Sequence, residues 1–230
     1  MKEEKITDMN NVRSENFFWK KKRLVTAVLA LGVLCILAGT ILRLRRGRDV
    51  GVEIRPDKGY PVGAVAAFYQ KDERWKGDKL GTSGYTMAGS GCLTSCIASA
   101  LSTQYQNTGA GSAMTAGELN KMLSEHEVYN GQGDILWARL EEALPGVRVL
   151  VASSVKPQEI EELLTQGHYP LVKVKVGGSG AAHWVLLVGS EEGEYLCMDP
   201  LEESGKPIPL SRHGSVAYRM RCVYWDGIKE

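Results

Sequence analysis

The sequence has almost no excess of charge of either sign. Its 230 residues include 28 Lys and Arg against 27 Asp and Glu, so the formal net charge is +1. Nucleic-acid-binding proteins are recognised by clustered basic residues, and no basic stripe interleaved with aromatic residues follows residue 60. The sequence also has no internal repeats. We therefore expect no nucleic-acid partner and no repeat architecture.

The sequence contains few residues of the types that bind metals. It has four His and five Cys, and a zinc site needs several such ligands at suitable spacing. Cys92 and Cys96 form a pair, but no histidine lies near them in sequence. We expect neither a metal nor a cofactor. Cys197 and Cys222 fall in predicted strands that could be neighbours, and a disulfide between them stays open because it depends on an oxidising compartment.

One long apolar run stands out from this balanced composition. Leu24 to Leu42 is 19 residues without a charge, and at 1.5 Å per residue it would span about 28 Å, the thickness of a bilayer core. Cleaved signal peptides have a shorter apolar core and a small-residue cleavage site. The run therefore predicts one uncleaved transmembrane helix, between a basic tail (residues 1–23) and a charged linker (residues 43–60).

Residues 61–230 have a length that suits one domain with a sizeable core. Helices are expected first, with a capping box at Thr115 and Glu118, a helix capped by Asp134, and a helix opened by Pro157. Strands are expected at 147–152, 171–176 and 217–223. Helices followed by an antiparallel sheet define an α+β fold.

A predicted hairpin places two titratable groups together. The runs HWVLLV and EYLCMD flank GSEEG, a polar turn bounded by glycines. If Val188 pairs with Glu194, His183 lies opposite Asp199, with Cβ atoms roughly 5 Å apart. A carboxylate in that place would fix the imidazole tautomer and stabilise its cation. A surface ion pair at a strand end is the alternative interpretation.

A nucleophile is expected at Cys92. In AGSGCLTSCIASALS, apolar residues after Cys92 recur with helical spacing, so this cysteine lies near a helix N-terminus, where the dipole and free N–H groups favour thiolate. Gly91 would leave room for a substrate backbone. Cys96 is expected in the core. With a later His and Asp, Cys92 is a better candidate nucleophile than a structural cysteine.

These residues occur in an order that resembles a known family. QKDERW at Gln70, SGC at Cys92, AHWVLLVG at His183 and MDP at Asp199 are similar to motifs of the bacteriocin-processing cysteine peptidases, family C-thirty-nine, and most of all to their stand-alone branch. The resemblance covers about residues 66–223.

The resemblance implies a papain-like fold and roles for four residues. Cys92 would be the nucleophile, His183 the base, Asp199 the orienting acid and Gln70 an oxyanion-hole donor. Two departures stand out: Gln70 lies 22 residues before Cys92, and Leu93-Thr94 replaces a common Gly-Pro. The expected partner is a peptide or protein substrate, with no transporter domain in this chain.

Other functions remain possible from the residues alone. A peptidoglycan amidase or a transglutaminase-like acyl-transfer enzyme could use the same groups, and an inactive peptide-binding domain is the alternative outside enzymes. Trp75, Trp137 and Trp184 are expected to pack in the core, and His168 and His213 to be loop histidines.

The membrane orientation can be tested with a reporter fused after Glu230. Basic residues within about 20 positions of the run number six on each side, so charge does not decide. An anchor ahead of a hydrolase commonly displays it outside the cytoplasm, so we expect the reporter to be extracytoplasmic. An impermeant protease that digests the domain only after cell lysis would reverse this orientation.

Overall fold

The computed structural model describes Gly32, residues 50–109 and residues 111–226. The chain divides into two units, residues 1–49 and 50–230, and the second carries the described fold. The predicted tail and the predicted span Leu24–Leu42, apart from Gly32, lie outside the described residues. None of the helices in the described part of the chain combines the length and the hydropathy that a membrane span requires.

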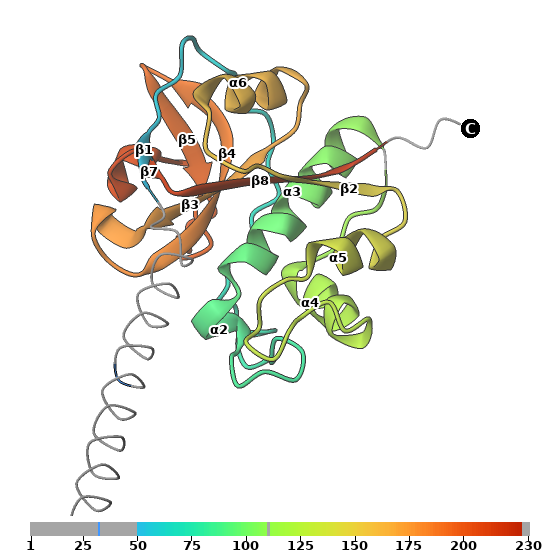
Figure 1. Ribbon diagram of the computed structural model, residues 1–230. Coiled ribbons are helices and arrows are strands. Elements are labelled where there is room, and N and C mark those ends of the chain that lie inside the picture. The colour runs from blue at the N-terminus through green and yellow to red at the C-terminus, as the bar shows by residue number, and fades with distance from the viewer. Residues whose placement is uncertain (1–31, 33–49, 110, 227–230) are drawn as a thin grey trace, which may run out of the picture. The chain divides into compact units, whose positions relative to one another are not determined.

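The fold is a mixed one with an antiparallel sheet (Figure 1). In chain order its elements are β1 Val52–Glu53, α2 Met87–Ser90, α3 Cys92–Thr108, α4 Ala116–Glu125, α5 Trp137–Ala143, β2 Val147–Val151, α6 Pro157–Thr165, β3 Pro170–Lys175, η1 Val176–Gly178, β4 Ala182–Glu191, β5 Glu194–Met198, β6 Ile208–Pro209, η2 Leu210–His213, β7 Val216–Ala217 and β8 Arg219–Trp225. Six strands form one sheet in the order β2-β8-β3-β4-β5-β6, and β1 pairs with β7.

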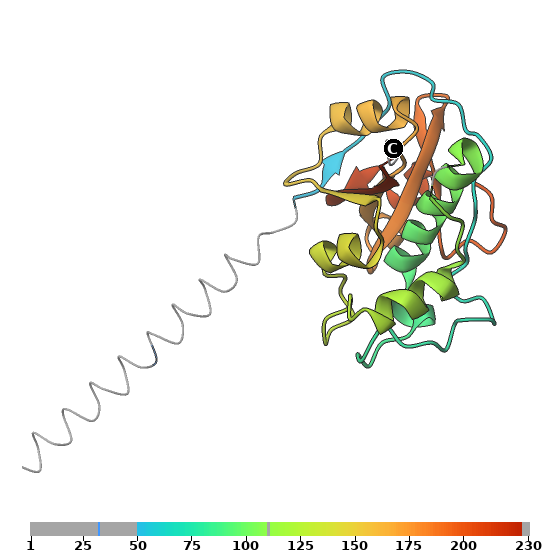
Figure 2. The same cartoon turned by 90° about the vertical axis from the view of Figure 1, so that its right-hand side faces the viewer.

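Helices cover both faces of this sheet (Figure 2). On one face α3 and α4 bury Leu101 and Leu119 in a core shared with Leu171 and Leu186. On the other face α6 buries Ile160 against Val172 and its neighbours in β4 and β5. Alternation along β3 and β4 sends successive side chains to these two cores. The α+β prediction is therefore confirmed.

The predicted helices and strands are found close to their expected positions. Thr115 and Glu118 form the capping box of α4, and Pro157 opens α6. The cap predicted at Asp134 is wrong: α5 starts at Trp137 after the N-cap residue Leu136. The Asp134 backbone N–H instead bonds the Asn130 side chain within a tight loop, 2.9 Å away.

Part of the segment that we expected to be a linker packs on the domain. Residues 52 and 53 form β1 against β7, and Ile54 is fully buried. The backbone of Tyr60 exchanges hydrogen bonds with Ser190 of β4, at 3.2 and 2.9 Å. A two-residue strand between charged residues leaves too short a pattern to be recognised in the sequence.

The far end of α3 is tied to the end of β8 by one side chain. The buried Gln104 amide donates to the Trp225 carbonyl at 2.8 Å and accepts from the Trp225 N–H at 2.7 Å. Both backbone groups are therefore satisfied by a single residue.

Replacing this side chain should destabilise the fold. Gln104→Ala leaves a buried N–H and a buried carbonyl unpaired, so we expect it to lower the free energy of unfolding by about 2–4 kcal/mol. Urea denaturation measures the loss. Gln106→Ala, at an exposed position of the same helix, is the matched control and should change stability by less than about 0.5 kcal/mol. Equal losses of unfolding free energy in the two variants would show that the Gln104 side chain does not tie α3 to β8.

Candidate active site

Cys92 is the first residue of α3. The first-turn N–H groups of a helix have no intrahelical acceptor, and the helix dipole places partial positive charge there. Gly91, just before Cys92, was expected to leave room for a substrate backbone, and this stays a prediction. A Cβ at Gly91 would lie 2.5 Å from the Met87 carbonyl oxygen, so the tight α2–α3 junction requires this glycine.

His183 lies near the start of β4, next to α3. The Cys96 thiol donates to the Trp184 carbonyl at 3.4 Å, which fixes α3 against the strand. Cys92 lies one helical turn earlier, and its side chain is close enough to raise the pKa of His183. The Nε2 atom of His183 faces Asp199 at 2.6 Å, so Nδ1 is the ring nitrogen left for Cys92.

Asp199 follows the last residue of β5 and accepts three hydrogen bonds. Its Oδ1 atom receives His183 Nε2 and the Leu201 N–H, the latter at 2.8 Å. Its Oδ2 atom lies 3.2 Å from His213 Nε2. Burial raises the pKa of the carboxyl, but the two histidine hydrogen bonds outweigh burial and hold the pKa well below its usual range. Asp199 is therefore a carboxylate at neutral pH.

His183 and Asp199 are brought together by a different strand register from the predicted one. The turn is Glu192-Gly193, not the five-residue GSEEG, and both residues have positive φ, as in a tight type I′ hairpin. Glu191 pairs with Glu194, and after an irregularity at Val188 the pairing becomes Leu187 with Cys197. Continued in this register, Asp199 lies opposite residue 185 and diagonal to His183, on the same face and within side-chain reach.

His183 is itself held in a charged form. Burial lowers the pKa of the imidazole, but hydrogen bonds to Asp199 and Cys92 and the charges of both groups raise it to about 9. The imidazolium therefore persists through neutral pH and is lost as the pH rises through about 9. A histidine charged by an aspartate and placed beside a cysteine is suited to stabilising a thiolate.

Gln70 also comes close to these residues. Its backbone N–H donates to the Pro200 carbonyl at 2.9 Å, and its side-chain amide donates to the Ala88 carbonyl at 2.8 Å. The side chain is 4% exposed. It thus connects the chain after Asp199 with the segment that leads into Cys92, despite its 22-residue separation from that cysteine.

His213 is the residue that sequence analysis missed. We expected a loop histidine, but it is the last residue of η2, 5% exposed and within hydrogen-bond distance of Asp199. No periodic pattern or motif marks it in the sequence. Only the path of the chain after β6 brings it to the carboxylate.

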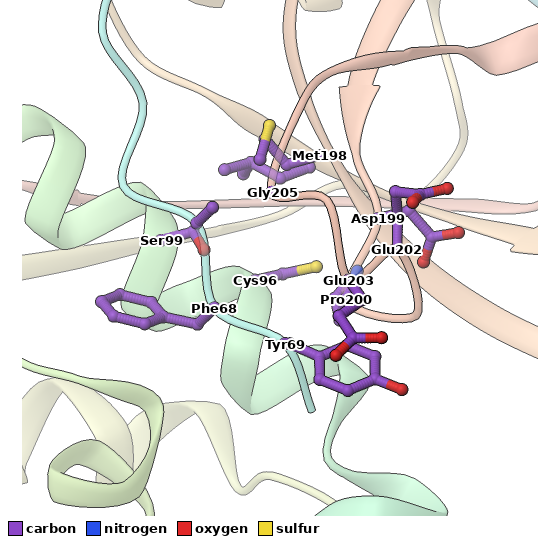
Figure 3. Close-up of a pocket in the computed structure, with 12 residues that line it drawn as sticks. Phe68, Tyr69, Cys96, Ser99, Met198, Asp199, Pro200, Glu202, Glu203 and Gly205 are labelled. Carbon is purple, nitrogen blue, oxygen red and sulfur yellow. The ribbon is translucent and has the colours of Figure 1, made fainter. Parts of the chain in front are cut away.

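Cys96 is buried, as predicted, at 1% exposure. Burial, with smaller contributions from neighbouring negative groups, raises the pKa of its thiol. Its sulfur points into a small cavity of about 60 Å³ between Phe68, Met198 and the Asp199–Gly205 segment (Figure 3). This position keeps Cys96 as a neutral thiol in the core.

Cys92 opens onto a different and larger cleft. This cleft, of about 410 Å³, is lined by α3, the loop before α5 and the strands β3, β4 and β8. Trp137 and Trp184 pack partly against the core, as expected, and also line the cleft. Arg219 and Arg221 line the cleft as well.

The two cysteines of the sheet lie in strands that are not neighbours. Cys197 in β5 and Cys222 in β8 are separated by β3 and β4 in the sheet, and both are free thiols. The disulfide that the sequence left open is therefore not formed. Within the described ranges of the chain, no group of three or more His, Cys, Asp or Glu residues is arranged to hold a metal ion.

Proteins similar to this chain are found among solved structures. No protein-family model and no curated protein matches the chain. A crystal structure from Bacillus anthracis, provisionally described as a C-thirty-nine-like peptidase, is similar, with 14% identity, a TM-score of 0.44, and coverage of 73% of this chain and 98% of that chain. This similarity agrees with the resemblance seen in the sequence motifs.

The state of His183 can be tested by NMR titration. Asp199→Asn removes the charge and the strong acceptor, so the pKa of His183 should fall from about 9 toward its ordinary value of about 6.5. The imidazole Cε1–H resonance, assigned with His183→Ala, reports the pKa. His126→Gln, outside the site, is the control and should leave it unchanged. An unaltered pKa in Asp199→Asn would show that Asp199 does not stabilise the imidazolium.

Proposed function

We propose that this protein is a cysteine peptidase with a papain-like fold, hydrolysing peptide bonds through Cys92, His183 and Asp199. The observation that supports this most is the 2.6 Å hydrogen bond between His183 and the buried Asp199 carboxylate, beside a Cys92 side chain that raises the pKa of His183. A thiol at a helix N-terminus beside an imidazolium is the arrangement that nucleophilic catalysis by cysteine needs.

The reaction follows from the positions of these groups. The Cys92 thiolate attacks the carbonyl carbon of a peptide bound in the cleft, giving a tetrahedral oxyanion. The His183 imidazolium then donates its Nδ1 proton to the leaving amine. Water, deprotonated by the neutral His183, attacks the acyl-enzyme, and the thiolate and imidazolium are restored as the acid product leaves. Asp199 keeps the ring oriented throughout.

The oxyanion needs hydrogen-bond donors near Cys92. In this proposal they are the backbone N–H of Cys92 and the second hydrogen of the Gln70 amide, since the first is used by the Ala88 carbonyl. Loss of one such donor typically raises the barrier by roughly 3–4 kcal/mol.

The cellular setting of this proposal comes from the sequence alone. We propose a single-pass anchor at Leu24–Leu42 with the catalytic unit outside the cytoplasm. The substrate would be a peptide or protein that reaches the membrane surface.

The assignment of the nucleophile can be tested with a thiol-directed peptidyl probe. We expect the probe to label Cys92, because Cys92 lines the open cleft and Cys96 is buried. Cys92→Ala should abolish both labelling and peptide hydrolysis. Mass spectrometry of the labelled protein locates the modified residue.

Cys96→Ala is the matched variant, one helical turn away. It should lower the melting temperature and leave labelling and turnover within about twofold of wild type. Label on Cys96, or activity remaining in Cys92→Ala, would rule out the mechanism. Labelling of Cys92 with hydrolysis of cell-wall fragments but not of peptides would instead point to an amidase.

A further inference from the structure

The buried carboxylate of Asp199 is shared between two histidines from different elements. His183 of β4 lies on Oδ1, and His213 of η2 lies on Oδ2. All three side chains are less than 10% exposed, and the two imidazole rings have centroids 5.9 Å apart. Of these two histidines, His183 is the one whose pKa the Cys92 side chain raises. The second has no role in the reaction described above.

We propose that His213 is a positioning residue, which holds the Asp199 carboxylate in the orientation that His183 needs. A carboxylate turns about its Cβ–Cγ bond unless both oxygens are bound. Oδ1 has two donors, His183 and the Leu201 N–H. Oδ2 has His213, whose removal would leave a buried, charged oxygen without this donor. The cost of such an oxygen favours rotation of the group away from His183.

His213 donates to Asp199 through its Nε2 atom. A carboxylate only accepts, so His213 carries a proton on Nε2. Its Nδ1 atom is buried, with no hydrogen-bond partner among the described residues. The Nε2–H group is therefore the atom through which His213 holds Oδ2 of Asp199.

The short helix η2 holds His213 firmly in this place. Leu210, at the start of η2, is 1% exposed and belongs to the same core as Val172 of β3. Gly214 ends η2 with φ 81, and its N–H donates to the Ser211 carbonyl at 2.8 Å. A Cβ at Gly214 would lie 3.2 Å from Gly178, so η1 packs tightly behind this turn. The histidine thus stands on a packed element, as a positioning residue requires.

Two substitutions of similar size separate the positioning role from simple packing. His213→Gln places its amide N–H₂ about where Nε2 stands, within reach of Oδ2. His213→Asn keeps a polar amide but places it about where Nδ1 stands, too far to donate. We expect His213→Asn to lower kcat about 10- to 100-fold, as loss of such supporting hydrogen bonds typically does, with KM within about twofold. His213→Gln should recover most of that loss.

A second readout does not depend on hydrolysis. In His213→Asn the His183–Asp199 bond is less populated, so the NMR-measured pKa of His183 should fall, and in His213→Gln it should stay close to wild type. His168→Gln, a half-buried histidine that stacks on Tyr224 away from the site, is the control and should change neither readout. Melting temperatures and near-UV circular dichroism confirm that all variants are folded.

This inference rests on the proposed function only for its kinetic readout. If wild-type protein hydrolyses no peptide, the peptidase proposal fails, and the titration still tests His213. An unchanged or raised pKa of His183 in His213→Asn overturns the positioning role. Equal loss of kcat in the Asn and Gln variants overturns it too, because the position of the donor would then not matter.

Discussion

The buried hydrogen bond between His183 and Asp199 organises the rest of the site. It joins two side chains that are only 4% and 8% exposed, at 2.6 Å. Burying either charge alone would be costly, and breaking a buried pair by removing one partner typically costs about 3–5 kcal/mol. The surrounding chain therefore satisfies the carboxylate closely, with the Leu201 N–H and His213. The Pro200 carbonyl next to it accepts from the Gln70 N–H, so the same short segment positions both the proposed acid and the proposed oxyanion donor.

The proposed nucleophile and the proposed base come from separate layers of the fold. Cys92 stands on α3, which belongs to the helical core, whereas His183 stands on β4 of the sheet. The contact between the Cys96 thiol and the Trp184 carbonyl fixes these layers one turn away from the reacting groups. Gln104 fixes the other end of the same helix to Trp225. The distance between the Cys92 sulfur and the His183 ring thus depends on how the whole of α3, 17 residues long, packs against the sheet.

Sequence patterns were sufficient for the features that depend on local chemistry. The capping box of α4, the proline at the start of α6 and the strand positions were all predictable, because each depends on residues a few positions apart. The meeting of Cys92 with His183 was inferred from residue types and family resemblance. The hairpin register was not predictable, since GSEEG has the composition of a turn although Gly189 and Ser190 belong to β4. At Gly189 a Cβ would lie 2.6 Å from the Tyr60 carbonyl oxygen, a contact with a distant segment. His213 was missed for a similar reason, because its partner Asp199 lies 14 residues away in the sequence and no local pattern links the two.

The irregularity at Val188 has a consequence for how the length of this hairpin can vary. At the turn, paired residue numbers add up to 385, so in an uninterrupted ladder Asp199 would face residue 186 and point away from His183. The extra residue changes that sum to 384 and returns both side chains to one face. Deletion of a single residue from one strand of this hairpin would thus turn the Asp199 side chain to the opposite face of the sheet from His183, even if the sequence motifs around both residues stayed unchanged. Descendants of this sequence can keep the pair only if insertions and deletions between His183 and Asp199 come in compensating steps.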